Sequence, residues 1–246
     1  MIRVAVIGAG GYVGSALCAA LRGRADHVVT PVTRASYAAM RTQRYDVVIN
    51  AAMPSRRFWA AQHPAEDFTE TVHTTADLVY GWHFEKFVQI SSVSARCQRH
   101  TVYGRHKAAA EAVCGFGNAL VVRLGPMYSE GLTKGVLLDM LQRRPVYISA
   151  ESRYGFAPLE FVSRWVTDHL DRSGLVEVGA HNAVRLQEVA DYLGAAVEFT
   201  GEVDHQEVEH PEPEYPDARD VFRFLDAMRT RPGMSPVPPP GSGEAA

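Results

Sequence analysis

The sequence has little cysteine, and its cysteines are not arranged in pairs. Cys18, Cys97 and Cys114 are three in number, widely spaced, and contain no C-x-x-C motif. An odd, scattered set of this kind argues against a disulfide framework and against a zinc site, and it favours a reducing compartment. We therefore expect a cytoplasmic protein.

Long apolar runs and an excess of positive charge are also missing. No stretch approaches the ~20 apolar residues that a membrane span needs. Met1 leads directly into an apolar strand, without the basic and long apolar regions of a secretory signal. The formal net charge of −3 provides no basic field for nucleic acid or anionic lipid. Neither nucleic acid nor a membrane is an expected partner.

Histidine is present, but it is not clustered. The ten histidines are scattered along the chain, and His205 and His210 are the closest pair with flanking carboxylates. Their spacing suits neither a helical pair nor a metal-binding hairpin, so the sequence predicts no metal site.

What the sequence does contain is an alternation of short apolar runs and helical patterns. The 246 residues, 46% of them hydrophobic, are enough for one substantial core. Strands are expected at 3–7, 28–33, 46–51, 86–91 and 119–124, with helices at 12–22, 68–80 and 103–116 between them. This order is typical of βαβ units. It predicts an α/β fold, a Rossmann-type doubly wound parallel sheet occupying residues 1–125.

The pattern changes after Gly125. Helices at 135–142, 159–170 and 185–193, with short strands at 146–148 and 175–178, predict a small C-terminal α/β substrate-binding lobe, residues 126–231, interleaved with the core. The acid-rich stretch 202–220 is expected to be solvated. Residues 232–246 are rich in Pro, Gly and Ser and predict a disordered tail.

A glycine-rich turn joins the first expected strand to the first expected helix. Gly8, Gly11 and Gly14 have the spacing G-x-x-G-x-x-G. Glycine allows a sharp turn, close approach to a pyrophosphate and tight helix packing, and the helix N-terminus favours the phosphates. The sequence therefore predicts nucleotide binding here. An ordinary glycine-rich turn is the alternative, because it could have the same sequence pattern.

The end of the second strand bears on the choice between NAD and NADP. An acidic residue there would bind the ribose 2′-hydroxyl. This chain instead has Arg34, which can pair with a 2′-phosphate. NADP is favoured over NAD, with an ordinary surface arginine as the alternative.

Tyr103 and Lys107 lie at i and i+4, on one face of an expected helix. A phenol is a poor base at neutral pH, and an adjacent ammonium favours the phenolate. Y-x-x-x-K alone is common and usually marks a solvated helix face. Here the strand 86–91 runs into Ser92, whose hydroxyl could bond a reacting oxygen, and such strand ends are where sheet ligands bind.

The chain resembles the extended short-chain dehydrogenase/reductase family, the group of NAD-dependent epimerases and dehydratases, in five motifs that occur in the family's order. They are Gly8-Ala-Gly-Gly-Tyr-Val-Gly14, Asp46-Val-Val-Ile-Asn-Ala-Ala52, Phe87-Val-Gln-Ile-Ser-Ser92, Tyr103-Gly-Arg-His-Lys-Ala-Ala-Ala-Glu111 and Arg123-Leu-Gly-Pro-Met-Tyr128. With two later segments, the similarity extends to about Leu193.

The resemblance implies roles for individual residues. Tyr103 would be the general acid/base, Lys107 would hold the ribose and lower the tyrosine pKa, and Ser92 would orient the substrate. The residues implied to contact the cofactor are Gly8, Gly11, Tyr12, Val13, Ala51, Ala52, Tyr103, Lys107 and Leu124.

The function implied is an NAD(P)-dependent oxidoreductase or epimerase acting on a carbinol or ketone carbon of a nucleotide-linked sugar or similar polar metabolite. Thr71 stands where the family often has Asn, and only 11 positions separate Ser92 from Tyr103. The short interval and Arg34 favour a reductase. A non-catalytic nucleotide sensor and a redox-independent isomerase or lyase remain alternatives. A small-molecule substrate is the expected partner, with a homodimer left open.

Weaker signals concern residues near these motifs. Glu111, four residues after Lys107, is expected on the exposed helix surface, where such a pair contributes only about 0.3–0.5 kcal/mol. The loop after Ser92 carries three basic residues that could meet an anionic substrate or simply be solvated: Arg96, Arg99 and His100. Three tryptophans are expected in the core or a pocket wall: Trp59, Trp82 and Trp165.

Overall fold

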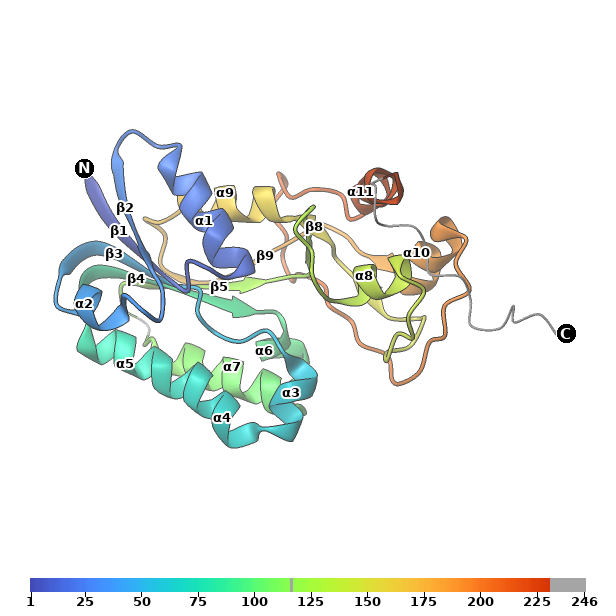
Figure 1. Cartoon of the computed structure of the whole chain (residues 1–246), viewed down its shortest axis with the longest axis horizontal. Helices are drawn as coiled ribbons and strands as arrows, with labels where there is room; N and C mark the ends of the chain where they lie inside the picture. The colour runs from blue at the N-terminus through green and yellow to red at the C-terminus, as the bar shows by residue number, and fades with distance from the viewer. Residues whose placement is uncertain (116, 231–246) are drawn as a thin grey trace, which may run out of the picture.

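The computed structural model describes residues 1–115 and 117–230, so the expected tail, residues 232–246, lies outside the described residues. A six-stranded parallel sheet forms the centre of the molecule (Figure 1), with strand order β2-β1-β3-β4-β5-β9. This confirms the doubly wound α/β class. The strands are β1 (Ile2–Ile7), β2 (His27–Val32), β3 (Arg44–Asn50), β4 (His83–Ser92), β5 (Ala119–Leu124) and β9 (Gly174–Val178).

The strand order creates a switch point between β1 and β3. From β1 the chain moves outward to β2, and from β3 it moves the other way through β4 and β5. The central strands are mostly apolar because helices cover both faces, and all six residues of β5, including Arg123, are buried. Ligands of such sheets bind at the carboxyl ends of the strands beside the switch point.

Helices cover the two faces of the sheet in separate layers (Figure 1). One face carries α1 (Tyr12–Arg22) and α9 (Leu159–Asp168), and the other carries α5 (Thr74–Gly81) and α7 (Val102–Val113). The helix expected at 68–80 begins earlier, at Pro64. A π-helical turn divides it into three consecutive elements, α4 (Pro64–Phe68), η1 (Thr69–His73) and α5. The remaining helices of this part are α2 (Tyr37–Arg41), α3 (Arg57–Gln62) and α6 (Ser94–Cys97).

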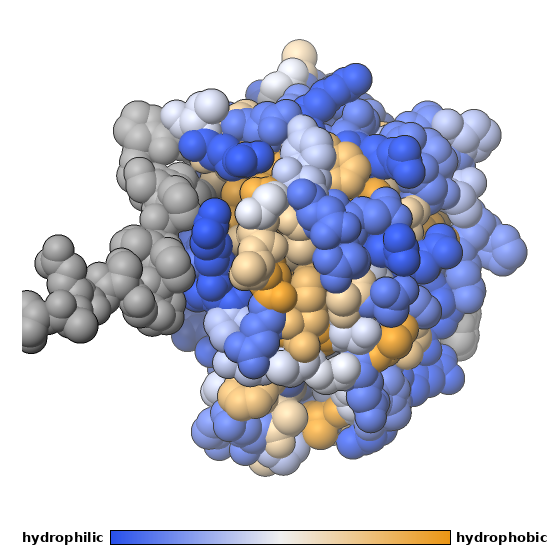
Figure 2. Space-filling model, turned by 90° about the vertical axis from the view of Figure 1, so that its right-hand side faces the viewer, coloured by the Kyte–Doolittle hydropathy of each residue, from blue (hydrophilic) through white to orange (hydrophobic). Residues whose placement is uncertain are grey.

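A smaller lobe lies at the carboxyl edge of the sheet and has its own apolar core. Seen from this end, a central apolar strip is bordered by hydrophilic residues (Figure 2). The strand expected at 146–148 is only a single bridge between Val146 and Phe199. The lobe elements are β6 (Met127–Tyr128), α8 (Val136–Leu141), β7 (Arg153–Tyr154), β8 (Ala157–Pro158), β10 (Val184–Arg185), α10 (Leu186–Leu193) and α11 (Asp220–Arg229).

Three expectations for the C-terminal half need correction. The helix expected at 159–170 is α9, which packs against α1 on a face of the main sheet rather than in the lobe. The strand expected at 175–178 is not part of the lobe, because β9 pairs with β5 and completes the main sheet. The stretch 202–220 is not simply solvated, since Gln206, Tyr215 and Ala218 are buried. Apolar and amide side chains between its acidic residues pack against the sheet and lobe.

Candidate active site

A cavity of about 1600 Å³ lies at the carboxyl ends of β1, β3, β4 and β5. It brings together segments that are far apart in the sequence: the glycine loop, the loops after β2 and β3, the end of β4, and α7. Every site residue predicted from the sequence lines it, namely Gly8, Gly11, Tyr12, Val13, Arg34, Ala51, Ala52, Ser92, Tyr103, Lys107 and Leu124.

The glycine loop has the close backbone contacts that its spacing predicts. Gly8 has φ +79°, and a Cβ there would lie 2.7 Å from the Cα of Ala52. A Cβ on Gly14 would overlap the Gly8 carbonyl. Because these glycines let the loop, the strand end and α1 approach each other, the first amides of α1 face the cavity edge. This backbone cradle suits a pyrophosphate.

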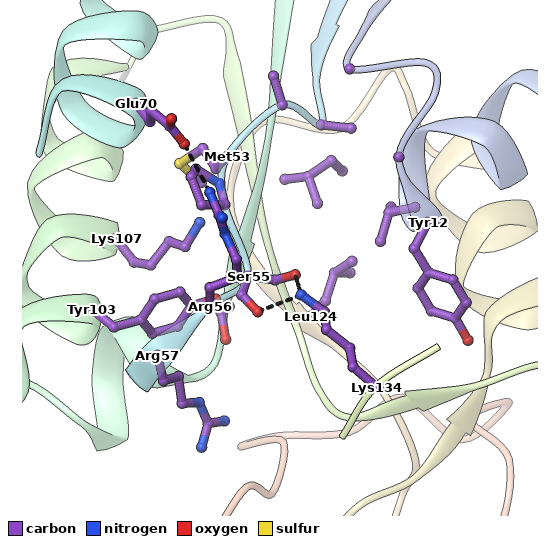
Figure 3. A pocket seen from close by; sticks show the side chains of 18 of the residues that line it. Tyr12, Met53, Ser55, Arg56, Arg57, Glu70, Tyr103, Lys107, Leu124 and Lys134 are labelled. Atoms are coloured by element: carbon purple, nitrogen blue, oxygen red, sulfur yellow. Dashed lines mark hydrogen bonds and ion pairs between the residues drawn. The ribbon is translucent and has the colours of Figure 1, made fainter. Parts of the chain in front are cut away.

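Tyr103 and Lys107 project from α7 into the cavity (Figure 3). Their side chains lie one turn apart, with the Lys107 Nζ 5.1 Å from the centroid of the Tyr103 ring. The helix begins at a capping residue, Thr101, whose Oγ1 accepts from the Gly104 amide at 3.0 Å. Gly104 has no room for a side chain, because its Cβ would overlap the Gln98 carbonyl. Close packing of α6 and α7 therefore sets the position of both side chains.

Burial dominates the electrostatics of this pair. Burial raises the pKa of Tyr103, while the Arg57 guanidinium and a hydrogen bond with Ser92 oppose that rise. Burial lowers the pKa of Lys107 to about 7, against the opposing effect of Asp67 and Glu111. The cation that favours the Tyr103 phenolate in the cofactor-free protein is thus Arg57, which the sequence did not single out.

Ser92 sits at the last position of β4, close to the start of α6. Its Oγ accepts a hydrogen bond from the Ser94 amide at 3.2 Å. The same side chain hydrogen-bonds the Tyr103 hydroxyl. A substrate oxygen within reach of both hydroxyls could replace their mutual hydrogen bond and interact with each of them.

Several cavity residues were not anticipated from the sequence. Arg57 and Tyr154 both contact Asp204, with Arg57 Nη1 to Oδ2 at 2.7 Å and the Tyr154 hydroxyl to Oδ2 at 2.8 Å. On the other side, the Lys134 Nζ donates to the carbonyl and hydroxyl oxygens of Ser55 at 2.8 and 2.9 Å (Figure 3). Ser55 and Arg57 follow the carboxyl end of β3. This position in the sequence could have indicated that they line the cavity, because ligands bind at the carboxyl ends of such strands.

Glu111 is not on the exposed helix surface, contrary to expectation. It is buried, accepts a hydrogen bond from Ser91 Oγ at 2.6 Å, and binds the Arg123 guanidinium at 2.7 and 2.9 Å. Arg123 also lies 3.5 Å from Glu177. The face of α7 that carries Glu111 therefore packs against β4, and Glu111 reaches Arg123 of β5 in a buried ionic network behind the active site.

The basic residues after Ser92 do not line the cavity described here. Arg96 lies on α6 and binds Glu177 at 2.8 Å and Glu209 at 3.0 Å. Arg99 Nε donates to the Ala95 carbonyl at 3.1 Å. The interval before Tyr103 is thus occupied by a short helix that faces the C-terminal segment. Trp82 and Trp165 are buried and Trp59 lines the cavity, as expected.

Residues 1–115 and 117–230 contain neither a metal-binding cluster nor a membrane-spanning helix. This part of the chain holds no cluster of three His, Cys, Asp or Glu side chains placed to bind a metal ion. Within the same residues, none of the helices has the length and apolar character needed to span a membrane.

Comparison with solved structures shows the same fold in nucleotide-sugar enzymes. A dTDP-4-dehydrorhamnose reductase from Bacillus anthracis in complex with NADP has a TM-score of 0.75 at 13% identity, covering 92% of this chain and 98% of that one. UDP-glucose 4-epimerase from Thermotoga maritima with UDP-glucose also gives 0.75 at 13% identity, covering 93% and 99%.

A third solved structure and a family model are also similar to the chain. UDP-glucuronic acid 4-epimerase from Bacillus cereus, in complex with UDP-glucuronic acid and NAD, has a TM-score of 0.68 at 15% identity, covering 96% of this chain and 94% of that one. No curated protein sequence matches the chain. The model of the NAD dependent epimerase/dehydratase family matches residues 4–143. The chain belongs to the NAD-dependent epimerase/dehydratase family.

Proposed function

We propose that the protein is an NAD(P)-dependent oxidoreductase or epimerase that acts on a carbinol or ketone carbon of a nucleotide-linked sugar. The observation that carries this proposal is the shared cavity. Ser92, Tyr103 and Lys107 line the same space as the glycine loop that suits a pyrophosphate. The nucleotide-sugar ligands named for the structures of similar fold support the same substrate class.

The roles of the residues follow from their positions. A bound nicotinamide cofactor supplies or accepts the hydride. In the direction of reduction, Tyr103 donates its phenolic proton to the oxygen of the reacting carbonyl, and in oxidation it takes the proton back. Ser92 orients that oxygen by a hydrogen bond. Lys107 would hold the nicotinamide ribose, and the Arg57 guanidinium favours the phenolate form of Tyr103.

Within this class, we favour net reduction over epimerisation. Only 11 positions separate Ser92 from Tyr103. This interval contains α6, with Arg96 bound to Glu177 rather than facing the cavity. Arg34, exposed at the end of β2 and lining the cavity, supports NADP as the cofactor.

The direct test is hydride transfer by the purified protein. Absorbance of the reduced nicotinamide should fall when NADPH and a panel of UDP- and dTDP-linked keto-sugars are supplied. A matched assay for epimerised product without net change in absorbance separates the two reaction types. Tight cofactor binding with neither reaction on the panel would favour the non-catalytic sensor instead.

Arg34 gives a prediction about cofactor choice. NADPH should bind more tightly than NADH, because a charge-assisted contact to the 2′-phosphate contributes about 1.5–3 kcal/mol, roughly tenfold to a hundredfold in affinity. Arg34→Ala should remove most of this preference in a fluorescence titration. Arg44→Ala, which removes an exposed arginine paired with Glu85, is the matched control. Equal affinities of the unmutated protein for both cofactors would contradict the prediction.

Lys107 gives a second prediction, on cofactor affinity. Lys107→Met keeps the length of the buried side chain and removes its ammonium, so the contact with the ribose hydroxyls is lost. The dissociation constant for NADPH should rise about tenfold, the value of one charged hydrogen bond. Turnover should fall as well. Titration by cofactor fluorescence measures the first effect, and an unchanged affinity would show that Lys107 does not hold the ribose.

A further inference from the structure

Arg57, Tyr154 and Asp204 form a cluster at the substrate side of the cavity. They come from α3, β7 and the segment after α10, and the Arg57–Asp204 pair joins residues 147 positions apart. Figure 3 shows the Arg57 side chain beside Tyr103. Arg57 is the first residue of α3, and its charge acts on Tyr103, so the cluster lies next to the expected reacting position.

Asp204 has no capacity left for a ligand. Its Oδ2 accepts from Arg57 at 2.7 Å and from the Tyr154 hydroxyl at 2.8 Å. Its Oδ1 accepts from Gln98 at 2.8 Å and from Gln206 at 2.7 Å. A carboxylate offers about four lone-pair sites, and these four donors fill them. Asp204 therefore serves to fix the orientation of Arg57 and Tyr154.

Arg57 keeps donors that are not used within the cluster. A guanidinium carries five N–H donors in a planar fork and accepts no hydrogen bond. Arg57 donates to Asp204 and contacts the Tyr154 hydroxyl. Its side chain is 39% exposed and lines the cavity. The cluster thus presents guanidinium donors to the cavity, and the ligand group that meets them must be an acceptor.

We propose that Arg57 is a specificity-determining residue that binds a carboxylate on the sugar ring of the substrate, next to the carbon that exchanges hydride. This inference rests on the proposed function. A group within reach of both Arg57 and Tyr103 belongs to the sugar ring, since the diphosphate is attached at the anomeric carbon. A guanidinium fork binds a carboxylate in bidentate fashion.

The charges of the cavity agree with an anionic sugar. Its lining includes four cationic side chains, Arg34, Arg56, Arg57 and Lys134, together with Lys107, whose pKa burial lowers to about 7. Three carboxylates line the cavity: Glu70, Asp77 and Asp139. Arg56 is already bound to Glu70 at 3.4 Å. A nucleotide-linked hexuronate, which adds a carboxylate to the charge of the diphosphate, is therefore the substrate class that we assign.

The test compares two probes, UDP-glucuronic acid and UDP-glucose, which differ at one ring substituent. Dissociation constants are measured by calorimetry with the cofactor bound. The unmutated protein should bind UDP-glucuronic acid about tenfold to a hundredfold more tightly. Arg57→Gln should abolish this ratio and leave UDP-glucose binding nearly unchanged. Arg57→Lys, which keeps the charge and loses the fork, should give an intermediate ratio.

Controls separate recognition from folding. In Arg57→Gln, Asp204 keeps three hydrogen-bond donors but loses its paired cation, so the melting temperature should fall. UDP-glucose affinity measured on the same sample shows whether the site is still formed. Arg56→Gln makes the same change of charge at the adjacent position and should preserve the ratio. No preference in the unmutated protein, or a preference that survives Arg57→Gln, would overturn the inference and leave the proposed function in place. Binding of neither UDP-sugar would overturn both.

Discussion

Replacing Tyr103 with Phe should lower turnover by roughly 10²–10⁴-fold, the usual contribution of positioned acid–base catalysis. The ring would keep its packing on α7, and only the hydroxyl that contacts Ser92 would be lost. Cofactor affinity should change little, because Lys107 and the glycine loop are intact. Steady-state rates on the substrate found in the panel, with cofactor binding measured alongside, give both quantities.

The companion variants make this result specific. Ser92→Ala removes one hydrogen bond to the reacting oxygen and should reduce turnover by less than Tyr103→Phe. Tyr80→Phe removes a hydroxyl from a tyrosine that is 78% exposed, and it should have no effect. A Tyr103→Phe protein that turns over like the parent would show that another group exchanges the proton, and the redox-independent or non-catalytic interpretation would then apply.

Replacing Arg123 with Met should lower the free energy of unfolding by about 3–5 kcal/mol, because removal of one partner leaves a buried charge uncompensated. Glu111 is the carboxylate affected most, since Arg123 binds it through two nitrogens at 2.7 and 2.9 Å. Methionine fills much of the volume of the arginine stem, so the loss reflects charge more than cavity formation. Chemical denaturation of both proteins measures the difference.

An exposed ion pair provides the contrast for this prediction. Arg44 lies 3.4 Å from Glu85, and their side chains are 75% and 63% exposed. Arg44→Met should change stability by less than about 1 kcal/mol, as is usual for surface pairs. If Arg123→Met were as mild as Arg44→Met, the carboxylate of Glu111 would have to be stabilised by Ser91 alone or to bind a proton.

The parts of the fold and site that sequence could predict are those encoded locally. The strand β5 is apolar apart from Arg123, Gly8 and Gly11 stand at fixed positions after β1, and Tyr103 and Lys107 are one helical turn apart. Each of these patterns is complete within about a dozen residues. Because parallel strands place their carboxyl ends at one edge, local patterns were enough to expect that these residues meet.

The Arg57 cluster could not be predicted in this way. Arg57 and Tyr154 meet Asp204 across 147 and 50 positions of sequence, and only the packing of the lobe on the core makes them neighbours. The expectation that Glu111 is exposed was wrong for a related reason. Spacing identifies which helix residues share a face, but whether that face is solvated depends on what packs against it, in this case Arg123 of β5.

The sixth strand of the sheet has a consequence for synthesis of the protein. β9 (Gly174–Val178) pairs along β5, but the chain first leaves the sheet to build part of the lobe and α9. During vectorial synthesis, β5 therefore remains an open edge until residue 178 has left the ribosome. An unpaired apolar edge is a template for association with other chains. The nascent chain therefore carries the open apolar edge of β5 between completion of residue 124 and emergence of β9.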